Sequence, residues 1–140
     1  MCSSDLRPEI YNLIAKMKEI FTRTGAPVFG RDAGTLEQVD FLFLIGTKIS
    51  AIGLKYCNFC GFSDCATRQA NGGICAFNPG DLGIALGSAV SIAADHRLDT
   101  RIMYSAGLAA VELGLLGKDV KIAYGVPLSA TAKNPFFDRK

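Results

Sequence analysis

The chain has 140 residues, of which 49% are hydrophobic and 20% charged; this composition excludes an intrinsically disordered chain and favours one globular domain. Its 15 Lys and Arg and 13 Asp and Glu residues alternate without a basic run, so we expect no nucleic-acid partner. The longest uncharged stretch, residues 82–94, is shorter than the roughly 20 residues of a membrane-spanning helix. Because Asp5, Arg7 and Glu9 stand where a signal peptide would be apolar, we expect a cytoplasmic protein without a membrane partner.

The first part of the chain predicts a helix and then a strand. Apolar residues recur at three- and four-residue steps over residues 6–21, which is the period of an amphipathic helix, and Gly25 before Pro27 ends it. Residues 25–34 are rich in turn-forming residues and predict a turn. The apolar run that follows predicts a buried strand over residues 39–47.

The second part begins with an irregular loop over residues 53–79, where glycines, asparagines and four cysteines break every regular pattern. The elements expected after it are a helix over residues 79–96, a brief strand over 101–103, a helix over 105–116 and a strand over 120–126 limited by Pro127. The first of these helices is apolar nearly all round, so we expect it to be central and closely packed. Together the elements predict a mixed α/β (α+β) fold, a single layered domain over residues 1–140 with helices packed on a small sheet.

The cysteines of this loop form the pattern C-x2-C-x4-C-x9-C, at Cys57, Cys60, Cys65 and Cys75. Four thiolates suit an iron–sulfur cluster or a closed zinc site. Structural zinc usually takes two C-x2-C pairs, and only the first pair exists here, so the spacing favours a cluster and, because it is not the plant-type run, [4Fe–4S] over [2Fe–2S]. Zinc and incidental thiols remain the alternatives, and we interpret Cys2 as uninvolved.

Longer strings then carry a resemblance to a known family. C-N-F-C-G-F-S-D-C at residues 57–65 resembles the cluster-binding signature of ferredoxin-type modules. The strings at residues 81–90, 101–107 and 127–139 are similar to a prokaryotic family of uncharacterised proteins that contain a ferredoxin domain. The resemblance covers roughly residues 35–140, and it implies a [4Fe–4S] cluster on the same four cysteines in a protein whose reaction is not established.

A second resemblance concerns flavin-dependent nitroreductases. The helix that starts near Asp81, the next helix and the strand that ends at residues 125–127 are similar to elements of that fold. Those enzymes bind the FMN phosphate partly through an arginine-rich N-terminal segment, where this chain has only Arg7 and Arg23. The resemblance therefore implies a nitroreductase-like fold, with FMN as the less favoured cofactor.

Several residues outside the loop have two interpretations. The hydroxyl, amide and cationic side chains near the C-terminus suit an anionic ligand; they are Ser129, Thr131, Lys133, Asn134 and Arg139. The simpler interpretation is a tail that docks Phe136 and Phe137 on the core, with its polar side chains solvated. We expect His96 on the surface and Asp81 in the first turn of its helix, where the helix dipole favours a carboxylate.

These observations give a first functional hypothesis, an iron–sulfur protein that transfers or senses electrons and meets a redox partner protein. If the chain is an enzyme, it is an oxidoreductase. The alternatives are an interaction module that holds zinc on the same cysteines and a flavin-dependent reductase. The long apolar helix in a small protein also predicts a homodimer.

Overall fold

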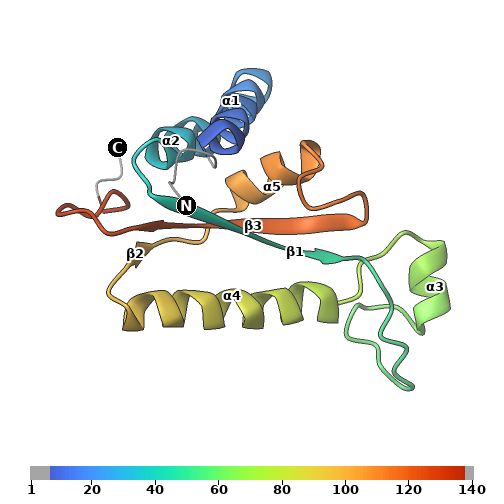
Figure 1. Ribbon diagram of the computed structural model, residues 1–140. Coiled ribbons are helices and arrows are strands. Elements are labelled where there is room, and N and C mark those ends of the chain that lie inside the picture. The colour runs from blue at the N-terminus through green and yellow to red at the C-terminus, as the bar shows by residue number, and fades with distance from the viewer. Residues whose placement is uncertain (1–6, 138–140) are drawn as a thin grey trace.

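The computed structural model describes residues 7–137, which form helices on both faces of a small sheet (Figure 1). The elements in chain order are α1 (Arg7–Thr24), α2 (Pro27–Leu36), β1 (Phe41–Lys48), α3 (Cys65–Ala70), α4 (Phe77–Asp95), β2 (Asp99–Thr100), α5 (Tyr104–Glu112) and β3 (Val120–Ser129). The described strands form an antiparallel sheet in the order β1–β3–β2, so the last strand in the sequence is the central one. The predicted mixed α/β class and single small domain are confirmed.

Figure 1 shows α1, α2 and α5 on one face of the sheet and α4 along the other. The core is correspondingly divided in two. The larger cluster joins the buried faces of α1, α2 and α5 and includes Leu13, Met17 and Phe29. The smaller cluster joins α4 to β3 and includes Leu86 and Val126. The central strand is therefore covered on both faces, and it is the most buried of the three.

The contact of α5 with β3 depends on glycine. A Cβ at Gly107 would lie 1.8 Å from the Ala123 carbonyl oxygen, a distance too short for any two non-bonded atoms. Gly125 lies against the Ala106 side chain in the same way, with 2.7 Å between a Cβ built on it and that of Ala106. The helix thus rests directly on the backbone of the strand, a distance that only these small residues allow.

A polar contact also fixes α5 within the larger cluster. The buried Ser105 hydroxyl donates to Asp32 Oδ2 of α2 at 2.5 Å, and Arg31 pairs with the other carboxylate oxygen at 2.8 Å. Because the carboxylate is buried, both partners are needed to offset its desolvation. The sequence predicted a helix over residues 105–116, whereas α5 begins at Tyr104, with Met103 at its N-cap, and ends at Glu112.

The helix α2 replaces the turn predicted over residues 25–34. Phe29, Ala33 and Leu36 are buried at helical spacing, and Pro27 stands at the start of the helix, where its fixed φ is favourable. Gly30 lies against the ring of Phe21, 3.3 Å from a Cβ built on it. Packing on α1 therefore outweighs the turn-forming composition of the segment.

The apolar helix α4 is not central, contrary to prediction. It buries one face on the sheet, through Leu82, Leu86 and Ala93, while Ile84 on the outer face is 71% exposed. Asp81 is also not in the first turn, because the helix begins four residues earlier, at Phe77. His96 follows the end of the helix and is exposed, as predicted. The homodimer stays a prediction.

The strands differ from the prediction in two ways. β1 is an edge strand, so Phe41 and Phe43 are 50% and 57% exposed rather than buried. β3 continues through Pro127 to Ser129. Gly125 N donates to the Met103 carbonyl at 2.9 Å, and N–H groups two residues apart point to the same side of a strand. Pro127, which has no N–H, thus faces the gap between β2 and Met103. The hydrogen bonds along this side of β3 are interrupted there, so the strand loses no bond at the proline.

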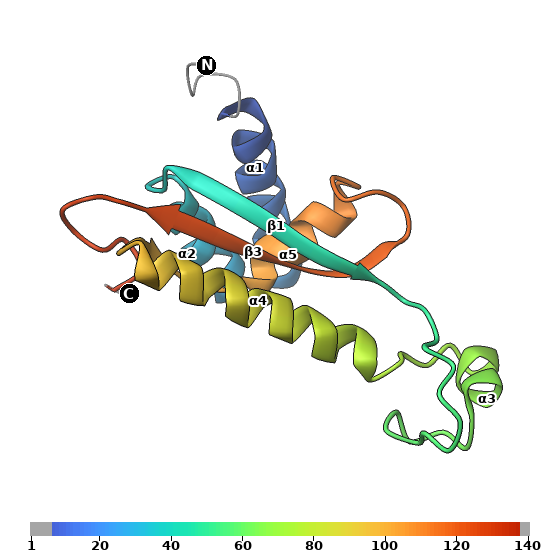
Figure 2. The same ribbon diagram turned by 60° about the horizontal axis from the view of Figure 1, so that its bottom comes forward.

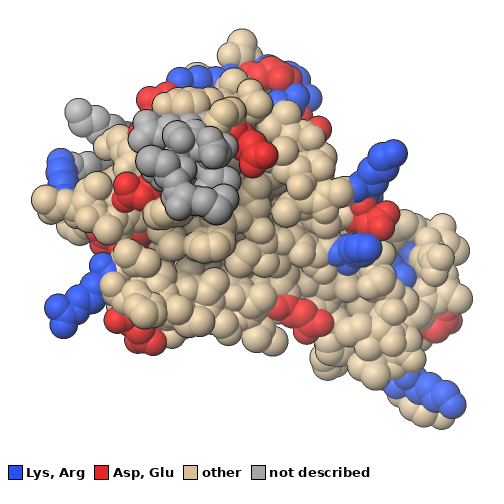
Figure 3. Space-filling model, viewed as in Figure 1, with Lys and Arg blue, Asp and Glu red and all other residues tan. Residues whose placement is uncertain are grey.

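Within the described part of the chain, no helix is both long and apolar enough to cross a membrane. On the face shown in Figure 3, positive and negative side chains are scattered and do not gather into a patch of one sign.

Candidate metal centre

The segment between β1 and α4, residues 49–76, forms a lobe that stands beyond the end of the sheet (Figure 2). A residue just after β1 and one in the first turn of α4 hold the two ends of this lobe side by side. Ser50 N donates to the Asn78 side-chain oxygen at 3.1 Å, and Asn78 is buried. The sheet and α4 therefore fix where the lobe starts and ends, although its interior is irregular.

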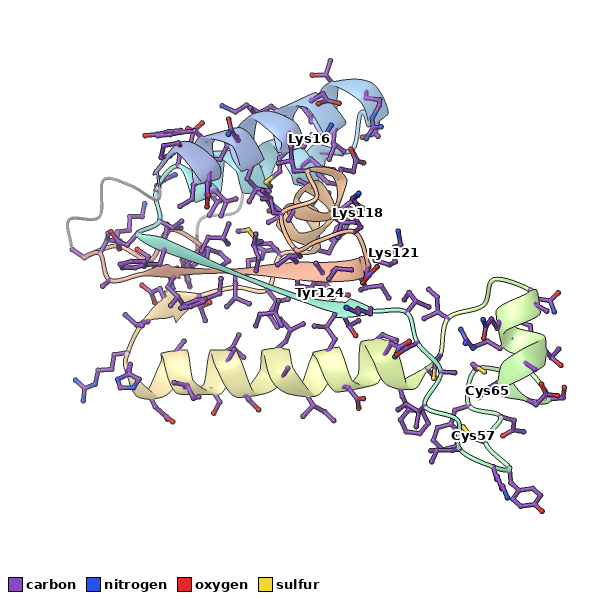
Figure 4. The ribbon with its side chains drawn as sticks, turned by 45° about the vertical axis from the view of Figure 1, so that its right-hand side comes forward. Lys16, Cys57, Cys65, Lys118, Lys121 and Tyr124 are labelled. Atoms are coloured by element: carbon purple, nitrogen blue, oxygen red, sulfur yellow. The ribbon has the colours of Figure 1, made fainter. Side chains whose placement is uncertain are left out.

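All four predicted ligands lie in this lobe, and all four are free thiols. Cys57 and Cys60 belong to the irregular part, Cys65 opens the short helix α3, and Cys75 lies just before α4. Figure 4 shows Cys57 and Cys65 together in the lobe, well away from the labelled lysines. Cys75 is only 6% exposed, whereas the other three are partly exposed. The side of the site formed by Cys57, Cys60 and Cys65 thus lies nearer to solvent.

Local hydrogen bonds fix the cysteine at the start of α3. Asp64 is the N-cap, and its Oδ1 accepts from Thr67 N at 2.8 Å. The Ser63 and Thr67 hydroxyls donate to the other carboxylate oxygen, each at 3.1 Å. These bonds, that from the Thr67 amide first, hold the pKa of Asp64 below its usual range. The six-residue helix therefore starts at Cys65 because its neighbour caps it.

Backbone amides surround the sulfur of Cys75. The N–H groups of Ile52 and Phe77 donate to it and lower the pKa of the thiol, and the nearby Arg68 guanidinium acts in the same direction. Ile52 lies on the chain that enters the lobe and Phe77 on the chain that leaves it. Both connections thus meet at this thiol, and a thiolate there would be stabilised as in an iron–sulfur or zinc site.

Arg68 is the buried cation of the lobe. Its side chain is 4% exposed, and Nη1 donates to the Gly73 carbonyl at 2.7 Å. The Phe62 ring leaves no room at Gly73 for a side chain, since a Cβ there would lie 2.6 Å from the ring. Arg68 Nε is buried without a hydrogen-bond partner in the described structure. A buried N–H of a cation without an acceptor is costly, so the lobe presents a donor for an anionic group.

The donor set, four soft thiols with backbone amides turned toward the buried one, fits an iron–sulfur cluster or a zinc site. Among residues 7–137, no three His, Cys, Asp or Glu side chains stand close enough together to hold one metal ion. A tetrahedral zinc site collects its sulfurs around a single centre at about 2.3 Å. In a four-iron cluster each cysteine binds a different iron, so the sulfurs lie farther apart. An iron–sulfur cluster is held by soft thiols and surrounded by hydrogen-bond donors. Here those donors are the backbone amides that point to Cys75 and the Arg68 Nε that has no acceptor.

Arg68 was not singled out by the sequence analysis, although a signal exists. It is the only Lys or Arg between Cys57 and Cys75, and it lies three residues after Cys65, on the same side of a helix. The prediction for this loop considered only side chains that could bind a metal. It did not consider side chains that could compensate the negative charge of those ligands.

The polar residues near the C-terminus contact one another and β2. The Ser129 and Thr131 hydroxyls are 3.0 Å apart, and Thr131 donates to the Lys133 carbonyl. Asn134 donates to Asp99 Oδ1 at 2.9 Å. Phe136 packs on the core, whereas Phe137 is exposed, so only one of the two predicted rings docks. Arg139 and Cys2 lie outside the described residues, and ligand binding by this segment stays a prediction.

Comparison with known proteins now places the chain in a class. Residues 71–139 match the family described as "Uncharacterized protein containing a ferredoxin domain", and a ferredoxin domain indicates an iron–sulfur protein in general. An uncharacterised protein of Archaeoglobus fulgidus is 43% identical over 139 residues, which span 94% of this chain and 74% of the relative. The chain therefore belongs to this ferredoxin-domain family, which confirms the first resemblance. No solved structure matches the chain, and the nitroreductase-like fold stays a prediction.

Proposed function

We propose that this chain is an electron-transfer or redox-sensing protein in which Cys57, Cys60, Cys65 and Cys75 bind a [4Fe–4S] cluster. The observation that carries the proposal is the lobe itself. It gathers the four thiols at one end of the fold and turns backbone N–H groups toward the buried one. Membership of a ferredoxin-domain family supports the same chemistry.

A bound cluster would supply the exchange of one electron at a time. The residues of the chain would set the conditions for it. The amides of Ile52 and Phe77 would stabilise the negative charge on the Cys75 sulfur, which is buried, while the Asp64 cap holds Cys65 at the start of α3. Hydrogen bonds to sulfur and the degree of solvent exposure are the levers by which a protein sets the potential.

The surface of the lobe suits the approach of a redox partner protein. Tyr56 and Phe59 are exposed beside Cys57 and Cys60, and the Phe59 ring stacks on Phe77 at 5.6 Å between centroids. Leu54 and Ile74 are also about half exposed. Aromatic side chains at a protein surface are enriched in interfaces, so a partner could dock on this apolar rim close to the cysteines.

The proposal is tested by purification without oxygen, followed by measurement of iron, acid-labile sulfide and zinc per chain. About four irons and four sulfides, with an EPR signal that changes on reduction with dithionite, are expected. About one zinc per chain without sulfide would refute the proposal and support the zinc-binding module. Resolved flavin absorption with no iron would instead support the reductase.

A single substitution then tests the ligands. Cys60→Ser should lower the iron and sulfide content and expose the lobe to limited proteolysis, because one corner of the cluster loses its thiolate. Cys2→Ser is the matched control, since it removes the fifth cysteine, which we interpret as uninvolved. Full iron and unchanged protease protection in Cys60→Ser would contradict the ligand assignment.

A further inference from the structure

We infer that Arg68 is the residue that compensates the negative charge of the cluster and thereby raises its reduction potential. The inference rests on the proposed function and assigns a role to a side chain that is not itself a ligand. Arg68 is thus a positioning and charge-compensating residue.

The position of Arg68 links the two halves of the cysteine site. It lies on α3 three residues after Cys65, and its Nη1 donates to the carbonyl of Gly73, two residues before Cys75. The side chain therefore fastens the helix that carries one predicted ligand to the segment that carries another. Its charge is also close enough to the Cys75 thiol to favour the thiolate.

The charge of Arg68 lacks a counter-ion inside the described structure. The side chain is 4% exposed, no carboxylate of residues 7–137 forms an ion pair with it, and Nε has no acceptor. A buried charge without a partner is strongly unfavourable, and a buried donor without an acceptor adds to that cost. The lobe is therefore built for an anion that reaches this guanidinium.

The anion is expected on the cysteine side of the guanidinium. A cavity of about 310 Å³ adjoins Arg68 and is lined by Ser50, Gln69 and Gly72, among others, but by no cysteine. Arg68 Nε is shielded from solvent, so a small anion that entered this open cavity would not reach it. The lobe has one carboxylate, Asp64, whose oxygens accept from Ser63 and Thr67. The other negative groups that the lobe itself can supply are the four thiolates and the cluster they hold.

A charge at this place has a measurable consequence. When dithionite donates an electron, the cluster gains one negative charge, and a nearby buried cation favours that reduced state. Arg68→Gln keeps a polar side chain and removes the charge. We expect it to lower the ratio of reduced to oxidised cluster at a fixed potential about tenfold, which corresponds to about 59 mV for one electron.

The experiment is a spectroscopic redox titration of the anaerobically purified wild type, Arg68→Gln, Arg68→Lys and Lys55→Gln, with iron and sulfide measured for each. Lys55 belongs to the same lobe but is exposed, so Lys55→Gln removes an equal charge that water already screens. Arg68→Lys restores the charge without the guanidinium. The expected result is a lowered potential in Arg68→Gln alone, with the potentials of Arg68→Lys and Lys55→Gln close to that of the wild type.

Four other outcomes are decisive. If Arg68→Gln loses the cluster while Arg68→Lys keeps it, the charge is needed for assembly and the inference holds. If Arg68→Gln keeps a full cluster at an unchanged potential, or if both Arg68 variants lose it, Arg68 serves only the structure of the lobe and the inference fails. A wild type without iron and sulfide would refute the proposed function itself, and this inference with it.

Discussion

The contact between α5 and β3 gives a prediction whose size follows from the structure. Gly107 lies in α5, and a Cβ built on it would stand 1.8 Å from the Ala123 carbonyl oxygen and 2.2 Å from the Ala123 carbonyl carbon. Both atoms belong to the backbone of the central strand, which cannot give way without disturbing its pairing with β1. Gly107→Ala must therefore push the helix away from the sheet.

The expected change in the free energy of unfolding is the difference between a small gain in helix propensity and a larger loss from overpacking. In a helix interior, alanine is favoured over glycine by about 1 kcal/mol. Overpacking a core typically costs about 1–3 kcal/mol and occasionally more, and a clash with backbone belongs at the upper end. We expect Gly107→Ala to lower the free energy of unfolding by about 2 kcal/mol, which lowers Tm by about 7 °C in a domain of this length.

The matched control is Gly83→Ala in α4. Gly83 is also helical, but nothing lies within 4 Å of a Cβ built on it, so only the helix-propensity gain applies, about 1 kcal/mol. Equilibrium urea unfolding of both variants and the wild type, followed by circular dichroism, measures the two changes. Unfolding free energies of Gly107→Ala and Gly83→Ala within about 1 kcal/mol of each other would refute direct packing of α5 on β3.

Two further predictions concern ionisable groups. Glu112 accepts from Arg23 at 2.9 Å and pairs with Lys16 at 3.4 Å, and Arg23 is the main cause that lowers its pKa; Glu112→Gln should therefore cost up to about 1 kcal/mol at pH 7. Because the pKa of Glu112 is lowered in the folded state, this stabilisation is present above the ordinary carboxyl range and is lost as the pH falls through the lowered pKa. The urea unfolding curves of the variant and the wild type should therefore converge in acid. A difference in unfolding free energy that does not change with pH would contradict the ion pairs. Asp64→Ala removes the N-cap oxygen that accepts from Thr67 N and should speed limited proteolysis of the lobe. Asp64→Asn keeps a capping oxygen and should keep the lobe protected. Equal cleavage of the two variants would show that the cap does not hold α3.

Local periodicity predicted the helices whose pattern lies within one segment. The helix expected over residues 6–21 is α1, and the one expected over residues 79–96 is α4, each within a few residues. The strands near residues 39–47 and 120–126 are β1 and β3. These elements are determined locally, because the spacing of apolar side chains decides which backbone period can bury them.

The helix α2 and the long strand β3 depended on context. The glycines of α2 favour a turn in isolation, and only the fit of Gly30 against Phe21 and the burial of Phe29 make a helix of the segment. Pro127 favours the end of a strand, but the gap in the β2 ladder leaves its missing N–H without consequence. For α2 the deciding contact is with Phe21 of another helix, and for β3 it is the interrupted pairing with β2. Neither contact belongs to the local pattern of apolar residues.

The sequence by itself predicted a metal centre, because four cysteines within nineteen residues lie in one short loop, a spacing that is typical of metal ligands. It also determined the mixed α/β class and the membership of a ferredoxin-domain family. Only the tertiary structure decided that β3 is central, that α4 exposes an apolar face, and that Arg68 Nε is buried without an acceptor. The physical reason is that burial and charge compensation depend on which distant segments meet, and a spacing of residues in one chain segment does not contain that information.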